Sequence, residues 1–359
     1  MAAVTDPPEP THRTEIPGLF TGIKGLVADG PMHSVISICI APTNEPTMTY
    51  TPAISTSALT KRYGGFEALV ALDLDVRPGE VFGFLGPNGS GKTTMIRMLT
   101  DEIRPSAGSA TILGLDCQRD TVAVRHHLGY LPGDLALYPK LTGRETLTYF
   151  ANLRGGVDWA FVDSLAERLD SDLSRHVGEM STGNRQKVGL IQAFMNKPDL
   201  IIMDEPSTGL DPLVQAEFQT MVREVADDGR TVFLSSHTLS EVQRVADRVG
   251  IIRHGHLIAV ETIVALQAKA VRRVELRFAT PVEATTFESV PGVRSVEVDE
   301  DRVSLRFDGA MSKLLDVVRD GPPLVDIATH DPSLEETFLT YYRDDDASVP
   351  LTPGAGAGA

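Results

Sequence analysis

One short segment limits what this chain of 359 residues can fold into more than any other feature. Gly86–Thr93, Gly-Pro-Asn-Gly-Ser-Gly-Lys-Thr, fits the phosphate-binding pattern G-x-x-x-x-G-K-[ST]. The apolar run Val81–Leu85 precedes it and the helical pattern Lys92–Leu99 follows it. A chance match in a chain of this length has a probability on the order of 1%. A plain glycine-rich turn would explain neither the lysine nor the hydroxyl, so the segment predicts a strand, a nucleotide-phosphate loop and a helix in succession.

The residue types in this loop each suit phosphate chemistry. Gly86, Gly89 and Gly91 let backbone N–H groups curl around phosphate oxygens, and the helix N-terminus adds positive potential. Lys92 brings a charge to the terminal phosphates, and the Thr93 hydroxyl is a ligand type that Mg²⁺ accepts. The other expected members of the nucleotide site are Pro87, Asn88 and Ser90 in this segment and Thr94 directly after it.

A second apolar run ends in two carboxylates. Leu200–Met203 predicts a buried strand, and Asp204 and Glu205 follow it directly. At a strand end beside a phosphate loop, Asp204 suits Mg²⁺ binding through water, and Glu205 is placed to polarise an attacking water. Alone, the pair would be best explained as a solvated acidic strand end. Together with the phosphate loop, it is better explained as part of a hydrolytic site.

Strands and helices alternate through the middle of the chain. Asp211-Pro212 is typical of a helix start, apolar residues then recur on one helical face, and Gly229 ends the pattern. Thr231–Leu234 predicts the next strand. Short apolar strands alternating with helices favour an α/β fold with a largely parallel sheet that is covered on both faces. The apolar residues of that helical face are Val214, Phe218, Met221, Val222 and Val225.

From about residue 271 the pattern changes to one typical of a small α+β module. Its elements follow the order β-α-β-β-α-β, which predicts a ferredoxin-like arrangement. We see no catalytic cluster within it. The expected elements are Val274–Phe278, Val282–Ser289, Val293–Val298, Val303–Phe307, Met311–Arg319, Leu324–Ala328 and Ser333–Tyr341.

Composition narrows the class of function. Lys and Arg number 33 against 49 Asp and Glu, a formal charge of −16. Such an acidic balance opposes binding to phosphate backbones, so no nucleic-acid partner is expected. The two cysteines, Cys39 and Cys117, lack metal-ligand spacing and favour a reducing compartment. No window approaches the roughly 20 apolar residues of a membrane span. No signal peptide is visible, and we expect a cytoplasmic protein.

These residues together resemble the ATP-binding cassette (ABC) ATPases of transporters. Met180–Asn184 is similar to the family's LSGGQ signature, and Gly209–Asp211 is similar to its D-loop. Ser236-His237 resembles the switch histidine, and Tyr63 stands where the family has an aromatic residue that stacks on adenine. Alone, His237 would be explained as a surface histidine and Tyr63 as a packing aromatic.

The resemblance implies ATP and Mg²⁺ as the bound groups and assigns roles to residues. Lys92, Glu205 and His237 are the expected catalytic residues, and Thr93 and Asp204 the expected metal-binding ones. It also implies a homodimer of cassettes, in which each ATP lies between one copy's phosphate loop and the other copy's signature. The nucleotide-binding residues expected outside the phosphate loop are Tyr63, Ser181, Gly183 and Asp211.

Further segments resemble the drug-export branch of this family, including cassettes like those of daunorubicin exporters. They are Tyr130–Pro132, Leu137–Pro139, Leu141–Glu145 and Asp331–Phe338. The resemblance implies an ATPase subunit at the inner face of the cell membrane, powering export of a drug or antibiotic through a separate membrane permease subunit. The alternative, a soluble cassette ATPase in translation or chromosome maintenance, is disfavoured by the single cassette, the absence of heptads and the acidic charge.

The resemblance and the composition predict four regions. Residues 1–53 are proline-rich and lack periodicity, and we expect a disordered N-terminal extension. Residues 54–270 are the expected ABC ATPase domain, with a helical subdomain at about 130–195. Residues 271–343 are the expected C-terminal accessory domain. Residues 344–359 are acidic and then Gly/Ala-rich, which predicts a disordered tail.

Two positions depart from the family pattern. The signature has Thr182 and Asn184 where the consensus has Gly and Gln. Gly133, followed by Asp134, stands where the family has a glutamine that touches Mg²⁺. Two explanations stay open: Asp134 reaches Mg²⁺ directly or through water, or a water fills the gap and Asp134 faces solvent or the partner.

Overall fold

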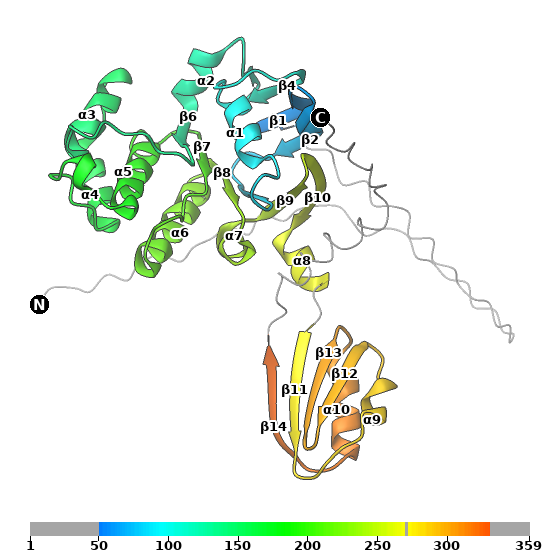
Figure 1. The fold of residues 1–359 in the computed structure, drawn as a ribbon. Coiled ribbons are helices and arrows are strands. Elements are labelled where there is room, and N and C mark those ends of the chain that lie inside the picture. The colour runs from blue at the N-terminus through cyan, green and yellow to red at the C-terminus, as the bar shows by residue number, and fades with distance from the viewer. Residues whose placement is uncertain (1–49, 270–271, 331–359) are drawn as a thin grey trace, which may run out of the picture. The chain divides into compact units, whose positions relative to one another are not determined.

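The structure is a computed structural model that describes residues 50–269 and 272–330 (Figure 1). The strands of these residues form three sheets. Two of them lie within residues 54–262, and the third belongs to the C-terminal module.

The central sheet has six strands and carries the predicted site. Its five neighbouring strands from β9 to β6 run parallel, and β10 pairs antiparallel with β9 at one edge. Every residue of β3, β7 and β8 is buried, as expected for strands covered on both faces. The order is β10 (His256–Thr262), β9 (Arg248–Arg253), β3 (Val81–Leu85), β8 (Thr231–Ser236), β7 (Leu200–Asp204) and β6 (Leu128–Leu131).

The two faces of this sheet pack against different apolar clusters. Along β3, Val81 and Leu85 join one apolar cluster, whereas Phe82 and Phe84 join the other. The first cluster includes residues of α6 (Pro212–Asp227) and α7 (Leu239–Val245). The second includes α1 (Lys92–Leu99) and a smaller antiparallel sheet, ordered β2-β1-β4-β5. That sheet and its neighbour helix comprise β1 (Ile54–Tyr63), β2 (Phe66–Val76), β4 (Ala107–Ile112), β5 (Leu115–Asp116) and α2 (Thr121–His127).

The predicted start and end of α6 are confirmed. The Asp211 carboxylate accepts hydrogen bonds from the backbone N–H groups of Leu213 and Val214, both at 3.1 Å, and Pro212 takes the first helical position. The apolar face expected from the sequence is buried throughout. Gly229 has φ +81°, the left-handed conformation that ends helices.

Three helices and a 3₁₀ turn follow β6, within the range of about 130–195 in which the helical subdomain was expected. In α3, Thr142 and Glu145 form a capping box. Arg168 of α4 pairs with Glu217 and Glu224 of α6 and thus ties the subdomain to the central layer. The elements are α3 (Gly143–Leu153), α4 (Trp159–Arg168), the 3₁₀ turn η1 (Val177–Glu179) and α5 (Thr182–Phe194).

The C-terminal module confirms the predicted ferredoxin-like order. Its sheet runs β12-β13-β11-β14 with every pair antiparallel, and α9 and α10 contribute to one shared apolar core. The predicted helix Ser333–Tyr341 lies outside the described residues. The elements are β11 (Arg272–Phe278), α9 (Thr285–Glu288), β12 (Val293–Asp299), β13 (Arg302–Phe307), α10 (Met311–Asp320) and β14 (Leu324–His330).

The predicted domain limits fall partly outside the described ranges. Residues 1–49 and 331–359 are not described, and the limit between 270 and 271 falls on two further such residues, just after α8 (Ile263–Lys269). At the N-terminal limit, Ala53 already belongs to the folded part. It is buried, its N–H donates to Val76 O, and its carbonyl accepts from Leu113 N. Residue 53 therefore belongs to the folded part and not to the expected N-terminal extension.

Candidate functional site: a nucleotide-phosphate loop

The phosphate loop lies between β3 and α1, as predicted. The Lys92 ammonium points back into it, donating to the carbonyl oxygens of Gly86 at 2.7 Å and Pro87 at 3.3 Å. It also lies 3.3 Å from Glu205 Oε1. Because the Lys92 side chain is only 5% exposed, its charge is directed into the loop rather than toward bulk water.

Two glycines of the loop cannot be replaced without moving backbone. A Cβ on Gly86 would lie 2.4 Å from the carbonyl oxygen of Ile252. Gly91 has φ +112° at the N-cap of α1, and a Cβ there would lie 2.7 Å from the carbonyl oxygen of Ala68. These contacts hold the loop closely against β9 and β2, so that its backbone curves around one point at the start of the helix.

The loop fits a phosphate group. The Ser90 hydroxyl is buried in it and has no hydrogen-bond partner among the described residues. A buried hydroxyl left unpaired costs free energy unless a ligand satisfies it. A lysine, an unpaired hydroxyl and the N-terminus of an eight-residue helix together suit an anion.

Magnesium also fits the donors present. The Thr93 hydroxyl is exposed in the first turn of α1, and Asp204 ends β7. In the described part of the chain, no group of three or more His, Cys, Asp or Glu side chains could hold a metal. Mg²⁺ commonly takes one or two protein oxygens and completes its shell with water and substrate phosphates.

The carboxylates Asp204 and Glu205 are held by β8. Asp204 is 1% exposed and accepts a hydrogen bond from the Ser235 hydroxyl. The backbone N–H of Glu205 donates to the Ser235 hydroxyl at 3.1 Å and lies 3.3 Å from Ser235 O. His237 Nδ1 lies 2.8 Å from Glu205 Oε2. Ser235, to which the sequence analysis gave no role, therefore positions both acids.

Glu205 holds an unusual backbone conformation. Its φ of +52° lies in the left-handed region, which costs a non-glycine residue on the order of 1–3 kcal/mol. Its Oε1 faces Lys92 and its Oε2 faces His237. Such strain persists only where the surroundings fix it, and here Ser235, Lys92 and His237 do so.

The predicted signature and D-loop lie against each other. Ser181 caps α5 by accepting a hydrogen bond from Asn184 N at 3.3 Å. A Cβ on Gly183 would lie 2.3 Å from the carbonyl oxygen of Gly209, and Gln186 Nε2 donates to Pro206 O at 3.1 Å. Among residues 50–269, no hydrogen bond or ion pair joins Ser181 or Gly183 to the phosphate loop.

Tyr63 lies at the end of β1 with its side chain exposed. Lys61 Nζ lies 5.0 Å from its ring centroid, a cation–π contact that leaves the other ring face free to stack. The hairpin that carries Tyr63 continues into β2, whose Ala68 backbone abuts Gly91 of the loop. The adenine contact expected of Tyr63 stays a prediction.

Gly133 lies beside the buried acid. A Cβ at this position would come within 2.9 Å of Asp204 Oδ2 and 3.2 Å of its Cγ. Asp134 is exposed and makes no hydrogen bond or ion pair with the residues that the structure describes. Nearby, burial raises the pKa of the Tyr130 phenol, and the charges of Glu102 and Asp204 act in the same direction. The sequence analysis assigned no role to Tyr130.

Comparison with known proteins identifies the family. The profile of the ABC transporter family matches residues 69–208. The daunorubicin resistance ATP-binding protein DrrA3 of Streptomyces coeruleorubidus is 36% identical over 305 residues, covering 82% of this chain and 96% of its own. The bacitracin transport ATP-binding protein BcrA of Bacillus licheniformis is 32% identical, covering 80% and 96%.

Solved structures show the same fold. The ATP-binding subunit of an ABC transporter aligns with TM-score 0.56 at 29% identity, over 60% of this chain and 92% of its own. The cassette MJ0796, in a dimeric post-hydrolysis state with ADP and Pi, aligns with TM-score 0.55 at 20% identity, over 58% and 98%.

Fold and site together define a nucleotide-binding P-loop protein of the cassette type. The chain belongs to the ATP-binding proteins of ABC transporters. None of the helices in residues 50–269 and 272–330 has the length and hydropathy that a membrane crossing requires.

Proposed function

We propose that this chain binds and hydrolyses ATP with Mg²⁺ and powers an exporter whose pathway is a separate membrane permease. The observation that supports this most is the convergence at Glu205. One carboxylate oxygen lies 3.3 Å from Lys92 and the other 2.8 Å from His237, directly after the buried Asp204. A phosphate-binding lysine and a carboxylate that positions the attacking water are groups used in phosphoanhydride hydrolysis, and a histidine beside that carboxylate can orient it.

Each of these residues has a distinct task. Lys92 holds the terminal phosphates in the loop by its charge. Glu205 accepts a proton from the attacking water, and His237 fixes the orientation of that carboxylate. Thr93 and Asp204 are the protein's oxygen donors for Mg²⁺, which when bound neutralises charge on the phosphate oxygens.

The proposed active unit is a homodimer. Gly183 lies against Gly209 of the D-loop, and among residues 50–269 no hydrogen bond or ion pair joins Ser181 or Gly183 to their own phosphate loop. Ser181 is exposed at the N-terminus of α5, where a helix favours an anion. A second copy facing the first head to tail would bring each signature to the other's nucleotide, with Asp211 near the contact and Tyr63 on the adenine.

Mixed dimers test this arrangement. Ser181→Asp keeps a good helix cap but puts a negative charge where the partner's phosphates would lie. We expect that Ser181→Asp by itself, and Lys92→Ala by itself, release no phosphate from ATP. Mixed in equal amounts they should recover roughly a quarter of wild-type turnover, because half of the dimers then hold one intact site of two.

The control for the mixture adds the same charge elsewhere in the subdomain. Ser164→Asp lies at an exposed position of α4 and should keep full turnover by itself. No recovery in the mixture, with both variants folded by circular dichroism, would contradict a composite site and favour hydrolysis within one copy.

The permease would dock on the nucleotide-binding part of the chain. A cavity of about 550 Å³ lies between the end of α1, β6 and helices α2, α3 and α5, with an apolar wall that includes Leu135, Leu137 and Phe150. Tyr130 and Pro132 also line it, so it begins one residue from Gly133 beside Asp204. A partner segment bound there would contact Tyr130 and Pro132. The next residue, Gly133, lies beside Asp204, the proposed metal ligand.

The cargo class comes from the relatives. DrrA3 and BcrA are described as daunorubicin resistance and bacitracin transport proteins, and we propose a drug or antibiotic as the exported molecule. The chain would then work at the inner face of the membrane, bound to its permease. Co-purification from membranes with a multi-span protein, lost when Leu137→Glu charges the cavity wall, tests this assembly; retention of the partner would contradict the docking site.

A further inference from the structure

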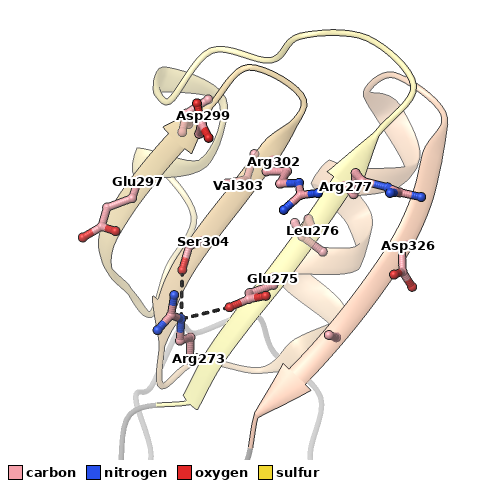
Figure 2. A pocket seen from close by; sticks show the side chains of 12 residues that line it. Arg273, Glu275, Leu276, Arg277, Glu297, Asp299, Arg302, Val303, Ser304 and Asp326 are labelled. Atoms are coloured by element: carbon pink, nitrogen blue, oxygen red, sulfur yellow. Dashed lines mark hydrogen bonds and ion pairs between the residues drawn. The ribbon is translucent and has the colours of Figure 1, made fainter.

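Within residues 272–330, the helices of the C-terminal module pack on one face of its sheet only. Along β11, Val274, Leu276 and Phe278 are buried in the core with α9 and α10, and the alternating side chains are exposed. Figure 2 shows these exposed side chains on the open face, together with those of the neighbouring strands. A cavity of about 570 Å³ lies over this face, within the range of small-molecule sites.

One row across this face has an unusual charge order. Arg302 of β13 is directly opposite Arg277 of β11. On their outer sides, Asp299 of β12 is opposite Arg302 and Asp326 of β14 is opposite Arg277. The row is therefore acid, arginine, arginine, acid across four strands.

These four side chains are not used to stabilise the module. Within residues 272–330, neither arginine side chain has a hydrogen bond or an ion pair, and neither do the side chains of Asp299 and Asp326. Figure 2 shows the Arg302 side chain reaching toward β11 and the Arg277 side chain reaching toward β14. By contrast, Arg273 on the same strand pairs with Glu275 at 3.2 Å and with the Ser304 hydroxyl at 3.2 Å.

Like charges directly opposite on neighbouring strands destabilise a sheet. Only the central arginine pair is unfavourable, because Asp299 and Asp326 lie opposite the two arginines on the outer strands. Within residues 272–330 neither aspartate forms an ion pair with its arginine. Charged side chains left unbonded in this way are typical of a functional site. A carboxylate or phosphate group between Arg277 and Arg302 would remove the repulsion and occupy donors that have fixed fork geometry.

The acidic rim limits the ligand further. Together with Asp299 and Asp326, Glu297 and Glu275 also line the cavity, so a polyanion or an anionic membrane surface would be repelled around the central pair. A molecule that carries one anionic group and an amine matches both signs. Neighbouring strands lie about 4.8 Å apart, which places either aspartate strand about 7 Å from the midpoint of the arginine pair.

We propose that the open face of the C-terminal module binds a small amphoteric molecule. Its carboxylate or phosphate lies between Arg277 and Arg302, and its amine, about 7 Å away, reaches Asp326 or Asp299. The site is independent of the ATP chemistry, because it uses no residue of the cassette.

Three linear probes test this assignment on the full chain. Calorimetric titration would compare 6-aminohexanoate, whose amine and carboxylate are about 7 Å apart when extended, with hexanoate and hexylamine. We expect 6-aminohexanoate to bind with a dissociation constant in the millimolar range and at least about fivefold more tightly than either single-charge probe. Equal binding of all three probes, or no binding of 6-aminohexanoate, would overturn the proposal.

Variants assign the two ends of the ligand. The double variant Arg277→Gln, Arg302→Gln should weaken binding of 6-aminohexanoate and hexanoate by at least about tenfold. The double variant Asp299→Asn, Asp326→Asn should remove the preference for 6-aminohexanoate while hexanoate still binds. Arg319→Gln, on α10 with 71% of its side chain exposed and paired within its own helix, removes the same charge away from the open face and should change nothing. Unchanged binding in the arginine double variant would refute the site.

Discussion

The phosphate loop and the open face of the C-terminal module both bring positive charge to a place where an anion fits, yet their residues come from the chain in opposite ways. The loop takes its lysine, hydroxyls and backbone N–H groups from one continuous segment. The open face takes Arg277 and Arg302 from two strands, with Asp299 and Asp326 on two more. A continuous site leaves a pattern in the sequence, and a cross-strand site does so only once the register is known.

Both sites contain a locally unfavourable feature, but of different kinds. In the cassette it is a backbone strain, the left-handed conformation of Glu205 at φ +52°. In the C-terminal module it is electrostatic: two arginines lie opposite each other, and within residues 272–330 their side chains form no hydrogen bond or ion pair. Strain held by Ser235 and His237 suits a base that must keep one orientation. Arginine side chains without an ion pair in the module are available for a ligand that binds reversibly.

The largest effect on ATP turnover is expected from Glu205→Gln. This change affects the cassette site and leaves the C-terminal module intact. The amide cannot accept the proton, so phosphate release should fall about 10³-fold, while nucleotide binding persists and an ATP-loaded dimer accumulates. Light scattering with ATP and Mg²⁺ would detect the dimer. Glu288→Gln, an exposed change in the C-terminal module, is the control. A monomeric variant with normal turnover would contradict the role of Glu205.

Lys92→Ala should have the next largest effect. The buried ammonium is the side-chain charge within the loop, and its loss should reduce turnover by at least about 10²-fold. Binding of 6-aminohexanoate to the open face should stay unchanged, since the two sites share no residue. The matched control Lys313→Ala removes an exposed lysine of α10. Full turnover in Lys92→Ala would show that the loop is not the phosphate site.

These two regions also show how far sequence could lead. The strands β3 and β7, the helix α6 with its Asp211 cap, and the ferredoxin-like order were all predictable, because burial periodicity and capping are local. The role of Ser235 was not, since it depends on the neighbouring strands β7 and β8 pairing in one register. The pairing of Arg277 with Arg302 could not be predicted either, because it depends on the register between β11 and β13.

A smaller effect on turnover is expected at Gly133. The sequence drew attention to Asp134 as a metal contact, whereas the structure places Gly133 beside Asp204. The sequence left open whether Asp134 serves the metal. Because a Cβ at 133 would lie 2.9 Å from Asp204 Oδ2, Gly133→Ala should displace that carboxylate. We expect the Mg²⁺ concentration for half-maximal turnover to rise about threefold, or about 0.6 kcal/mol.

Asp134→Ala is the comparison for Gly133→Ala. Its exposed side chain has no partner among the described residues, so the Mg²⁺ requirement of the isolated subunit should stay unchanged. A rise in that requirement for Asp134→Ala but not for Gly133→Ala would assign the metal contact to Asp134. A defect of Asp134→Ala seen only with the permease would place Asp134 in the docking contact.

The smallest effect is expected from Arg277→Gln, and its sign is opposite to that of most surface changes. Removing one of two opposed charges should stabilise the pairing of β11 and β13 by about 0.5 kcal/mol. Native-state amide hydrogen exchange of these strands would measure this without interference from cassette unfolding. The gain should vanish near 1 M salt, where the screening length is about 3 Å. Arg273→Gln is the matched control on the same strand: it loses the contacts with Glu275 and Ser304, so its exchange should not slow. If Arg277→Gln speeds exchange instead, Arg277 stabilises the free module, and the argument that its charge is kept for a ligand fails.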